Sequence, residues 1–109
     1  MKPAVRCRAS LELLTTEEGG RLNAIHSGYR GRFQPDIDDE RLQDDYFAVT
    51  EILGPPIAPG AKGTVAIRVG FNGVVPEIWS GLGFSLREGA RVVARGCVTQ
   101  VCGPEDDAT

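Results

Sequence analysis

The residues best able to do chemistry in this sequence are arginines beside turns. There are five of them: Arg21, Arg30, Arg32, Arg87 and Arg91. A guanidinium group forms paired hydrogen bonds with phosphate oxygens. If the fold brings these arginines to one face, they could hold an RNA backbone, mostly without reading its bases. In the structural alternative, Arg21 and Arg87 pair with nearby carboxylates and hold loops in place, the candidates being Glu17, Glu18 and Glu88.

Residues that would support catalysis or metal binding are few. The only histidine is His26, and its neighbour Ser27 would point to the opposite face of a strand. The sequence has neither a nucleophile motif around a Ser or Cys nor a phosphate-binding loop of the G-x-x-x-x-G-K-[ST] type. We therefore expect no catalytic residue, no metal site and no cofactor, and we do not expect an enzyme.

The three cysteines, Cys7, Cys97 and Cys102, lack the spacing of a zinc site. We expect free, buried thiols in a reducing cytoplasm. Cys97 and Cys102 are five positions apart, so a continuous strand would place them on opposite faces.

Size and charge narrow the class of protein. The 109 residues make one domain, residues 1–109, and the net charge is −3 with a pI of about 5.1. Nucleic-acid binders usually carry a basic excess, so the overall charge argues mildly against that role, and we expect no DNA partner. No stretch approaches the roughly 18 apolar residues of a membrane helix. We expect a cytoplasmic protein without a membrane partner.

The rest of the chain predicts strands and turns. Apolar and polar residues alternate over 4–14 and 63–71, as in half-buried strands. Further strands are expected over 46–52, 82–86 and 91–101, with a short extended piece over 29–33. At Gly96 the alternation breaks, which predicts a bulge or a close backbone approach. Six strands without a convincing helix indicate an antiparallel barrel or sandwich.

Two segments are expected to be solvated. Residues 36–45 hold six acidic residues against one arginine, which predicts an acidic loop, or alternatively an acidic face for a basic partner. Residues 103–109 are polar and acidic, and we expect a flexible tail.

Four blocks occur in a specific order: Glu18-Gly19-Gly20-Arg21, Tyr29-Arg30-Gly31-Arg32-Phe33, Pro59-Gly60 and Gly83-Phe84-Ser85-Leu86-Arg87-Glu88-Gly89-Ala90-Arg91-Val92-Val93-Ala94. In their order and spacing they resemble the C-terminal (third) β-barrel domain of bacterial elongation factor Tu. The resemblance implies an all-β, six-stranded antiparallel Greek-key barrel. The sequence departs from the family at Gly31 and Arg32, where the family has proline and glutamine, and at Ala90, where it has glycine.

In that family the domain grips the T-stem of aminoacyl-tRNA, and the resemblance carries this role to Arg30, Glu88 and Gly89, with Arg21 and Arg32 as neighbours. The family domain also contacts a nucleotide-exchange factor and its own GTPase domain. The first hypothesis is therefore a non-catalytic binding module that engages a protein partner, such as a translation factor or GTPase. The alternative is an RNA-binding module that recognises a tRNA acceptor or T-stem through an arginine face. A third reading is a domain that acts in trans with a GTPase.

Overall fold

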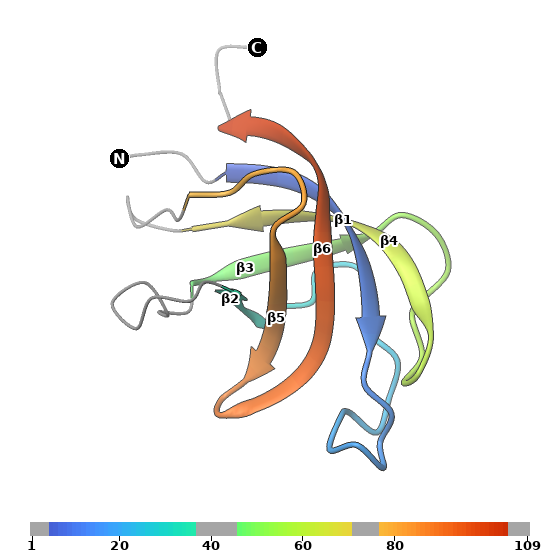
Figure 1. Ribbon diagram of the computed structural model, residues 1–109. Coiled ribbons are helices and arrows are strands. Elements are labelled where there is room, and N and C mark those ends of the chain that lie inside the picture. Colours follow the sequence, from blue (N-terminus) through green and yellow to red (C-terminus); the bar gives the residue numbers. More distant parts are fainter. Residues whose placement is uncertain (1–4, 37–45, 71–76, 105–109) are drawn as a thin grey trace.

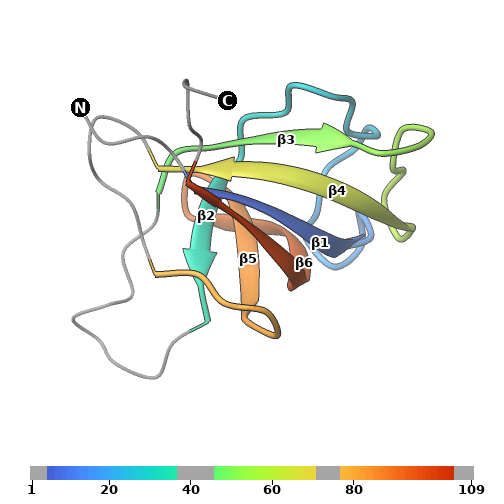
Figure 2. The same ribbon diagram turned by 90° about the horizontal axis from the view of Figure 1, so that it is seen from above.

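The computed structural model describes residues 5–36, 46–70 and 77–104, which form strands and loops and no helix. The strands are β1 (Val5–Leu13), β2 (Arg32–Pro35), β3 (Ala48–Ile52), β4 (Lys62–Val69), β5 (Gly83–Glu88) and β6 (Arg91–Pro104). They form one antiparallel sheet in the order β2-β5-β6-β1-β4-β3. The sheet curls into a half-barrel (Figures 1 and 2). The prediction of an all-β fold with a six-stranded antiparallel sheet is confirmed. No helix of the described residues is long and apolar enough to cross a membrane.

The two outer strands of this sheet, β2 and β3, are linked by isolated bridges between Phe33 and Tyr46 and between Tyr29 and Thr50. Phe33 and Tyr46 exchange backbone hydrogen bonds of 2.8 and 2.7 Å, and the Thr50 amide donates to the Tyr29 carbonyl at 2.8 Å. An unpaired strand edge is a template for aggregation. The bridges satisfy part of the edge of β3 and bring residues 29–33 beside it.

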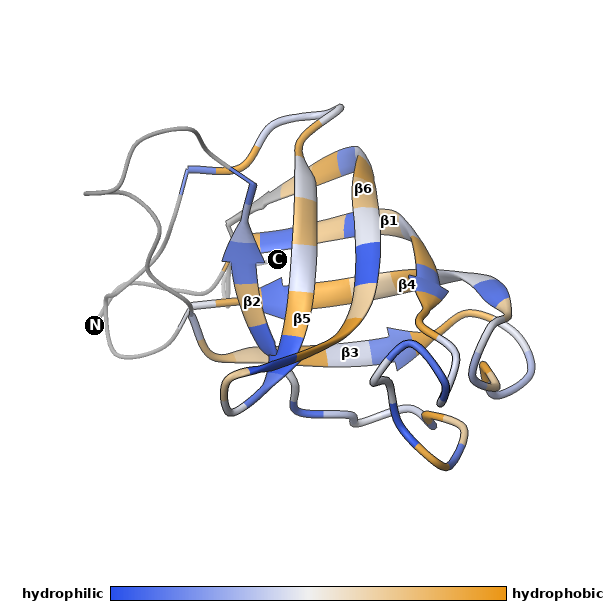
Figure 3. Cartoon of the chain, turned by 60° about the horizontal axis from the view of Figure 1, so that its bottom comes forward, coloured by the Kyte–Doolittle hydropathy of each residue, from blue (hydrophilic) through white to orange (hydrophobic). Residues whose placement is uncertain are grey.

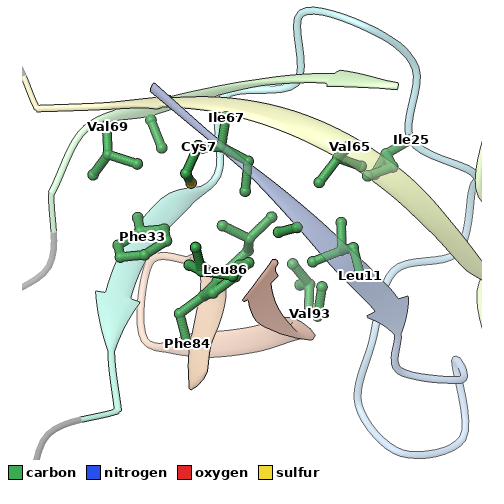
Figure 4. Packing of buried hydrophobic residues seen from close by; sticks show 14 of the residues in the cluster. Cys7, Leu11, Ile25, Phe33, Val65, Ile67, Val69, Phe84, Leu86 and Val93 are labelled. Carbon is green, nitrogen blue, oxygen red and sulfur yellow. The ribbon is translucent and has the colours of Figure 1, made fainter. Parts of the chain in front are cut away.

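Alternation of side chains explains why the sheet has one buried face. In β1 the apolar residues Cys7, Ala9, Leu11 and Leu13 are buried, and the residues between them are exposed. Figure 3 shows the same alternation as bands of hydrophobic and hydrophilic residues along the strands. Buried side chains from the curled sheet point into one interior (Figure 4), where the rings of Phe33 and Phe84 stack with centroids 4.6 Å apart.

Strand ends differ from the prediction by one to three residues, most of all at the start of β2 and at the end of β6. β2 begins at Arg32, and Tyr29 lies outside it in an isolated bridge. β6 continues to Pro104, three positions past the expected end, because Gly103 and Pro104 pair with Arg6 and Val5. β6 thus includes the first two residues of the expected tail, and 105–109 lie outside the described residues. Of the expected acidic loop only Asp36 is described, and it is exposed.

β6 has two bulges, and the one at Thr99 changes the face of Cys102 relative to that of Cys97. Thr99 and Cys102 have no Cα partner on β1, because the register shifts between Arg8 and Ala9 and again between Arg6 and Cys7. Each extra residue reverses the alternation that follows it. Cys97 and Cys102 are consequently both exposed, so the predictions of opposite faces and of buried thiols are wrong for them. Cys7 is buried, as expected.

Gly96 pairs in register with Leu11 on β1 and Phe84 on β5, so the bulges lie elsewhere on β6. A Cβ at this position would lie 2.4 Å from Phe84 Cζ and 2.8 Å from the Ser10 carbonyl oxygen. The predicted close approach at Gly96 is confirmed, since only glycine leaves room for the Phe84 ring.

Candidate functional site

The carboxylate of Glu88, at the end of β5, contacts side chains from three segments: the loop at Arg21, the segment at Tyr29 and the start of β6 at Arg91. Its Oε2 atom accepts hydrogen bonds from Arg21 Nη1 and from the Tyr29 hydroxyl, the latter at 2.5 Å. Its Oε1 atom faces Arg91 Nη2 at 3.3 Å. The Arg21 guanidinium also lies over the Tyr29 ring, 5.0 Å from its centroid. We call Arg21, Tyr29, Glu88 and Arg91 the Glu88 cluster.

Local turns place the members of this cluster. The turn before Arg21 is closed by Glu18, which accepts hydrogen bonds from the backbone and hydroxyl of Thr15 at 2.9 Å each. The hairpin between β5 and β6 turns at Gly89, whose φ of +64° favours glycine. At Gly31 a Cβ would lie 2.6 Å from the Tyr29 ring. A side chain there would displace the ring whose hydroxyl reaches Glu88.

The cluster shifts the pKa values of its members in opposite directions. Partial burial is the largest effect on Glu88 and raises its pKa. Hydrogen bonds from Tyr29 and Arg21, with the charge of Arg21, outweigh it and hold the pKa below its ordinary value. Burial, followed by the hydrogen bond to Glu88, raises the pKa of Tyr29. At neutral pH the hydroxyl is therefore a donor and Glu88 an ionised acceptor.

The remaining predicted arginines have other surroundings. Arg87 donates to Gln34 Oε1 at 3.1 Å and to the Ala90 carbonyl at 3.3 Å. Arg32, the Cα partner of Arg87, lies over the ring of Phe47 with its Cζ atom 4.4 Å from the centroid. Arg30 is exposed, and no hydrogen bond or ion pair joins it to any residue in the described part of the chain. The five arginines thus do not share one binding partner.

The structure supports part of the structural alternative for the arginines. Arg21 pairs with Glu88, as one form of that alternative expected. Glu18 is instead engaged by Thr15, and Arg87 contacts an amide oxygen and a carbonyl rather than a carboxylate. Of the predicted site residues, Arg21, Glu88 and Arg91 lie together, and Gly89 forms the adjacent turn.

Two features of the surface escaped the sequence reasoning. Tyr29 and Phe33 are four positions apart, so alternation along an extended segment predicts that both side chains share the inward face. Phe33 is fully buried, but Tyr29 is only half-buried and carries the hydroxyl that binds Glu88. Phe47 is 61% exposed. Its outward position could have been read from alternation with Ala48 and Thr50, which are buried.

The described residues contain no group of three or more His, Cys, Asp and Glu side chains that could hold a metal ion. His26 is exposed in a loop, and the hydroxyl of Ser27 accepts a hydrogen bond from the Ile52 amide at 2.9 Å. The Ser27 hydroxyl, next to His26 in the sequence, is therefore hydrogen-bonded to the backbone of β3. In a scan against models of known protein families, no family model matches this chain.

Proposed function

We propose that this chain is a non-catalytic binding module that engages a protein partner. The observation that carries the proposal is the exposure of Phe47, a large aromatic residue immediately before β3. It is 61% exposed, and the Arg32 guanidinium lies over its ring. Aromatic and arginine side chains are enriched in the centres of protein interfaces. Burial of this ring against a partner would recover hydrophobic stabilisation that the isolated chain lacks.

The partner class follows from the arginines that are already engaged. Arg21 and Arg91 contact Glu88, and Arg87 contacts Gln34 and the Ala90 carbonyl. To grip phosphates, Arg21 would have to leave a partly buried carboxylate, at a cost of about 1–3 kcal/mol. This cost, together with the net charge of −3, favours a protein over RNA. Under the resemblance to the third domain of elongation factor Tu, with its Greek-key barrel, the partner would be a translation factor or GTPase of the cytoplasm.

The second candidate is RNA binding at a tRNA acceptor or T-stem. The observation that favours it is Arg30, which is exposed and makes no hydrogen bond or ion pair within 5–36, 46–70 and 77–104. It stands in the block that resembles the tRNA-gripping segment. Arg91, 56% exposed, could turn from Glu88 toward a phosphate.

Site-specific photo-crosslinking tests the protein-partner proposal. A p-benzoylphenylalanine at position 47 is expected to crosslink to one defined protein in host cells. The same group at Thr64, an exposed residue on β4, serves as the control. The crosslinked protein is then purified, and its affinity for the wild-type chain is expected to be at least tenfold higher than its affinity for the Phe47→Ser variant. Equal crosslinking at both positions would contradict the proposal.

A tRNA titration at 50 and 200 mM salt tests the second candidate. Binding through phosphates must weaken steeply with salt. Arg30→Ala should then weaken binding and lower the salt slope by about one unit. No binding at low salt would exclude this candidate, and it would leave the protein-partner proposal untouched.

A further inference from the structure

The last bulge of β6 places Cys102 beside Cys7 on β1. Arg6 on β1 pairs with Gly103. The next residue, Cys7, pairs with Val101, so Cys102 is the extra residue of the bulge. In a bulge, two residues of one strand oppose a single residue of the other. Cys7 therefore faces both Val101 and Cys102, where the end of β6 lies beside the start of β1 (Figure 1).

Among the three cysteines, Cys7 and Cys102 are the pair that a disulfide can join. Opposed residues of an antiparallel pair have Cα atoms about 4.5–5.5 Å apart, and the Cα atoms of native disulfides are about 4.4–6.8 Å apart. Cys97 is opposite Ser10, three positions from Cys7 along β1, which adds about 10 Å at the rise of a strand. Cys97 and Cys102 are five positions apart on one strand, or about 15 Å. Both of these pairs are out of reach.

The two thiols of this pair have different surroundings. Cys7 is buried among the core side chains (Figure 4), and Cys102 is exposed. A move of the bulge by one residue would bring both to the same face. With Val101 as the extra residue, Cys102 would lie opposite Cys7 on the inward face. The two residues that end β6 would keep their present partners on β1, and the half-buried Val101 would turn outward.

Exposure and charge set the order in which the two thiols react. Cys102 is open to solvent, so its thiolate meets an oxidant first. Burial, followed by the charge of Cys102, raises the pKa of Cys7 to about 11. A neutral sulfenic acid at Cys102 would remove that charge and make Cys7 easier to ionise. Because Cys7 is also buried, its reaction is slow relative to the reaction of an exposed thiol.

We propose that the movable bulge at Cys102 lets Cys7 and Cys102 form a reversible disulfide when the chain meets hydrogen peroxide. The Cys102 thiolate attacks one peroxide oxygen, the O–O bond breaks, and the departing hydroxide takes a proton from solvent. This step leaves a sulfenic acid on Cys102. The Cys7 sulfur then attacks the Cys102 sulfur, the S–O bond breaks, and the hydroxyl group leaves as water with the thiol proton of Cys7. The two thiols are oxidised to a disulfide, and the peroxide is reduced to two water molecules.

The disulfide joins the first strand of the sheet to the last. Its closed loop contains most of the chain, and a long closed loop constrains the unfolded state strongly. The oxidised chain is therefore expected to resist denaturant better than the reduced chain. Reversible disulfides of this kind serve in redox sensing within reducing compartments. The inference does not rest on the proposed function.

The Cys97→Ser variant tests the inference, because it keeps only the two proposed partners. The chain is treated with a slight excess of hydrogen peroxide, denatured and alkylated with N-ethylmaleimide. We expect both thiols to escape alkylation and the intact mass to fall by two hydrogen atoms. Trypsin should release residues 96–109 joined to Cys7-Arg8, and dithiothreitol should restore both thiols. The urea midpoint of the oxidised chain should exceed that of the reduced chain.

Two single-residue deletions in the Cys97→Ser background test the movement of the bulge. Deletion of Val101 leaves Cys102 opposite Cys7 without any movement, so the disulfide should form at least fivefold faster. Deletion of Thr99 is the matched control, since it removes the other bulge of β6 and should change the rate less than twofold. Circular dichroism checks that both deletion variants fold, and the peptide map of the Cys97→Ser variant decides if they do not.

Four outcomes would overturn the inference. Both thiols of the Cys97→Ser variant could survive the peroxide, or Cys102 could be oxidised to a sulfinic acid while Cys7 stays free. A disulfide between two chains, seen as a dimer on a non-reducing gel, would refute the pairing within one chain. Equal rates in the two deletion variants would refute the movement of the bulge.

Discussion

The Tyr29 hydroxyl donates a 2.5 Å hydrogen bond to Glu88 Oε2 across 59 residues of sequence. This contact joins the segment that precedes β2 to the far end of β5. The same carboxylate oxygen holds Arg21, so one group fixes the loop before residue 25, the segment that bridges to β3, and the hairpin between β5 and β6. Removing the carboxylate should therefore loosen all three.

Glu88→Gln should lower the free energy of unfolding by about 1–3 kcal/mol, because Arg21 would lose its ionised partner in a partly buried site. Tyr29→Phe, which removes only the hydroxyl, should cost about 1 kcal/mol. Urea unfolding of both single variants and the double variant measures their coupling. A double variant whose loss is simply the sum of the two would show that the hydroxyl and carboxylate act independently.

The depressed pKa of Glu88 predicts an acid-sensitive contribution to stability. Because the folded-state pKa lies below the unfolded value of about 4.3, the contribution is present above that value and is lost as pH falls through the folded pKa. The wild type should lose stability relative to Glu88→Gln as the pH drops from about 5 toward 2. Denaturant midpoints of both proteins, measured at half-unit pH steps, should show that the difference in stability between wild type and Glu88→Gln narrows as the pH falls. A constant difference over this range would refute the linkage.

Gly96→Ala should destabilise the chain by about 1–3 kcal/mol, as overpacking in a tight core does. The new methyl group would meet Phe84 Cζ at 2.4 Å and the Ser10 carbonyl at 2.8 Å. Gly83→Ala is the matched control on the neighbouring strand, where the nearest atom would be Asp36 Oδ2 at 3.6 Å. Thermal unfolding should separate the two variants clearly, and equal midpoints would contradict the close approach.

Thr50→Val should leave stability unchanged or raise it by about 1 kcal/mol. Thr50 is fully buried, and its hydroxyl oxygen has no hydrogen-bond partner in the described ranges. Valine keeps the shape and removes the unsatisfied group. Thr50→Ser keeps the hydroxyl and removes the methyl group, so it should destabilise. Chemical denaturation gives the free energy of unfolding of both variants. If Thr50→Val is destabilised, the Thr50 hydroxyl must have a hydrogen-bond partner, and the prediction is wrong.

The three thiols should differ in reactivity. Cys97 and Cys102 are exposed, whereas burial, together with nearby Cys102, raises the pKa of Cys7 to about 11. A thiol that is both buried and protonated reacts slowly. At pH 8, Ellman's reagent should titrate two thiols in the folded chain and the third only after denaturation. In the Cys7→Ala variant, denaturation should release no further thiol. Three thiols that react equally fast in the folded wild type would contradict the burial of Cys7.

The strands could be predicted because side chains in a half-buried strand alternate between the core and the solvent, so apolar residues recur at every second position. The alternation from Val5 to Leu13 reports directly which side chains face the core. The bulges in β6 could not be predicted, since Thr99 and Cys102 carry no side-chain signal that they lack a partner on β1. One undetected bulge was enough to reverse the expected face of Cys102.

The candidate site was harder to predict than the fold for a related reason. Sequence neighbours suggested Glu17 or Glu18 as partners for Arg21, yet Glu18 is satisfied within its own turn by Thr15. The actual partner, Glu88, is 67 positions away and is brought close only by the curl of the sheet.

β6, the last strand in the described sequence, lies in the middle of the sheet, between β5 and β1. Until residues 91–104 leave the ribosome, β5 and β1 both lack a neighbour, and the pair β2 and β5 is joined to β1, β4 and β3 only by the bridges Phe33–Tyr46 and Tyr29–Thr50. Neither piece can cover its apolar face, and an isolated hairpin is only marginally stable. Folding during synthesis is therefore expected to wait for the final strand, so the nascent chain would depend on chaperones until that strand joins the two pieces.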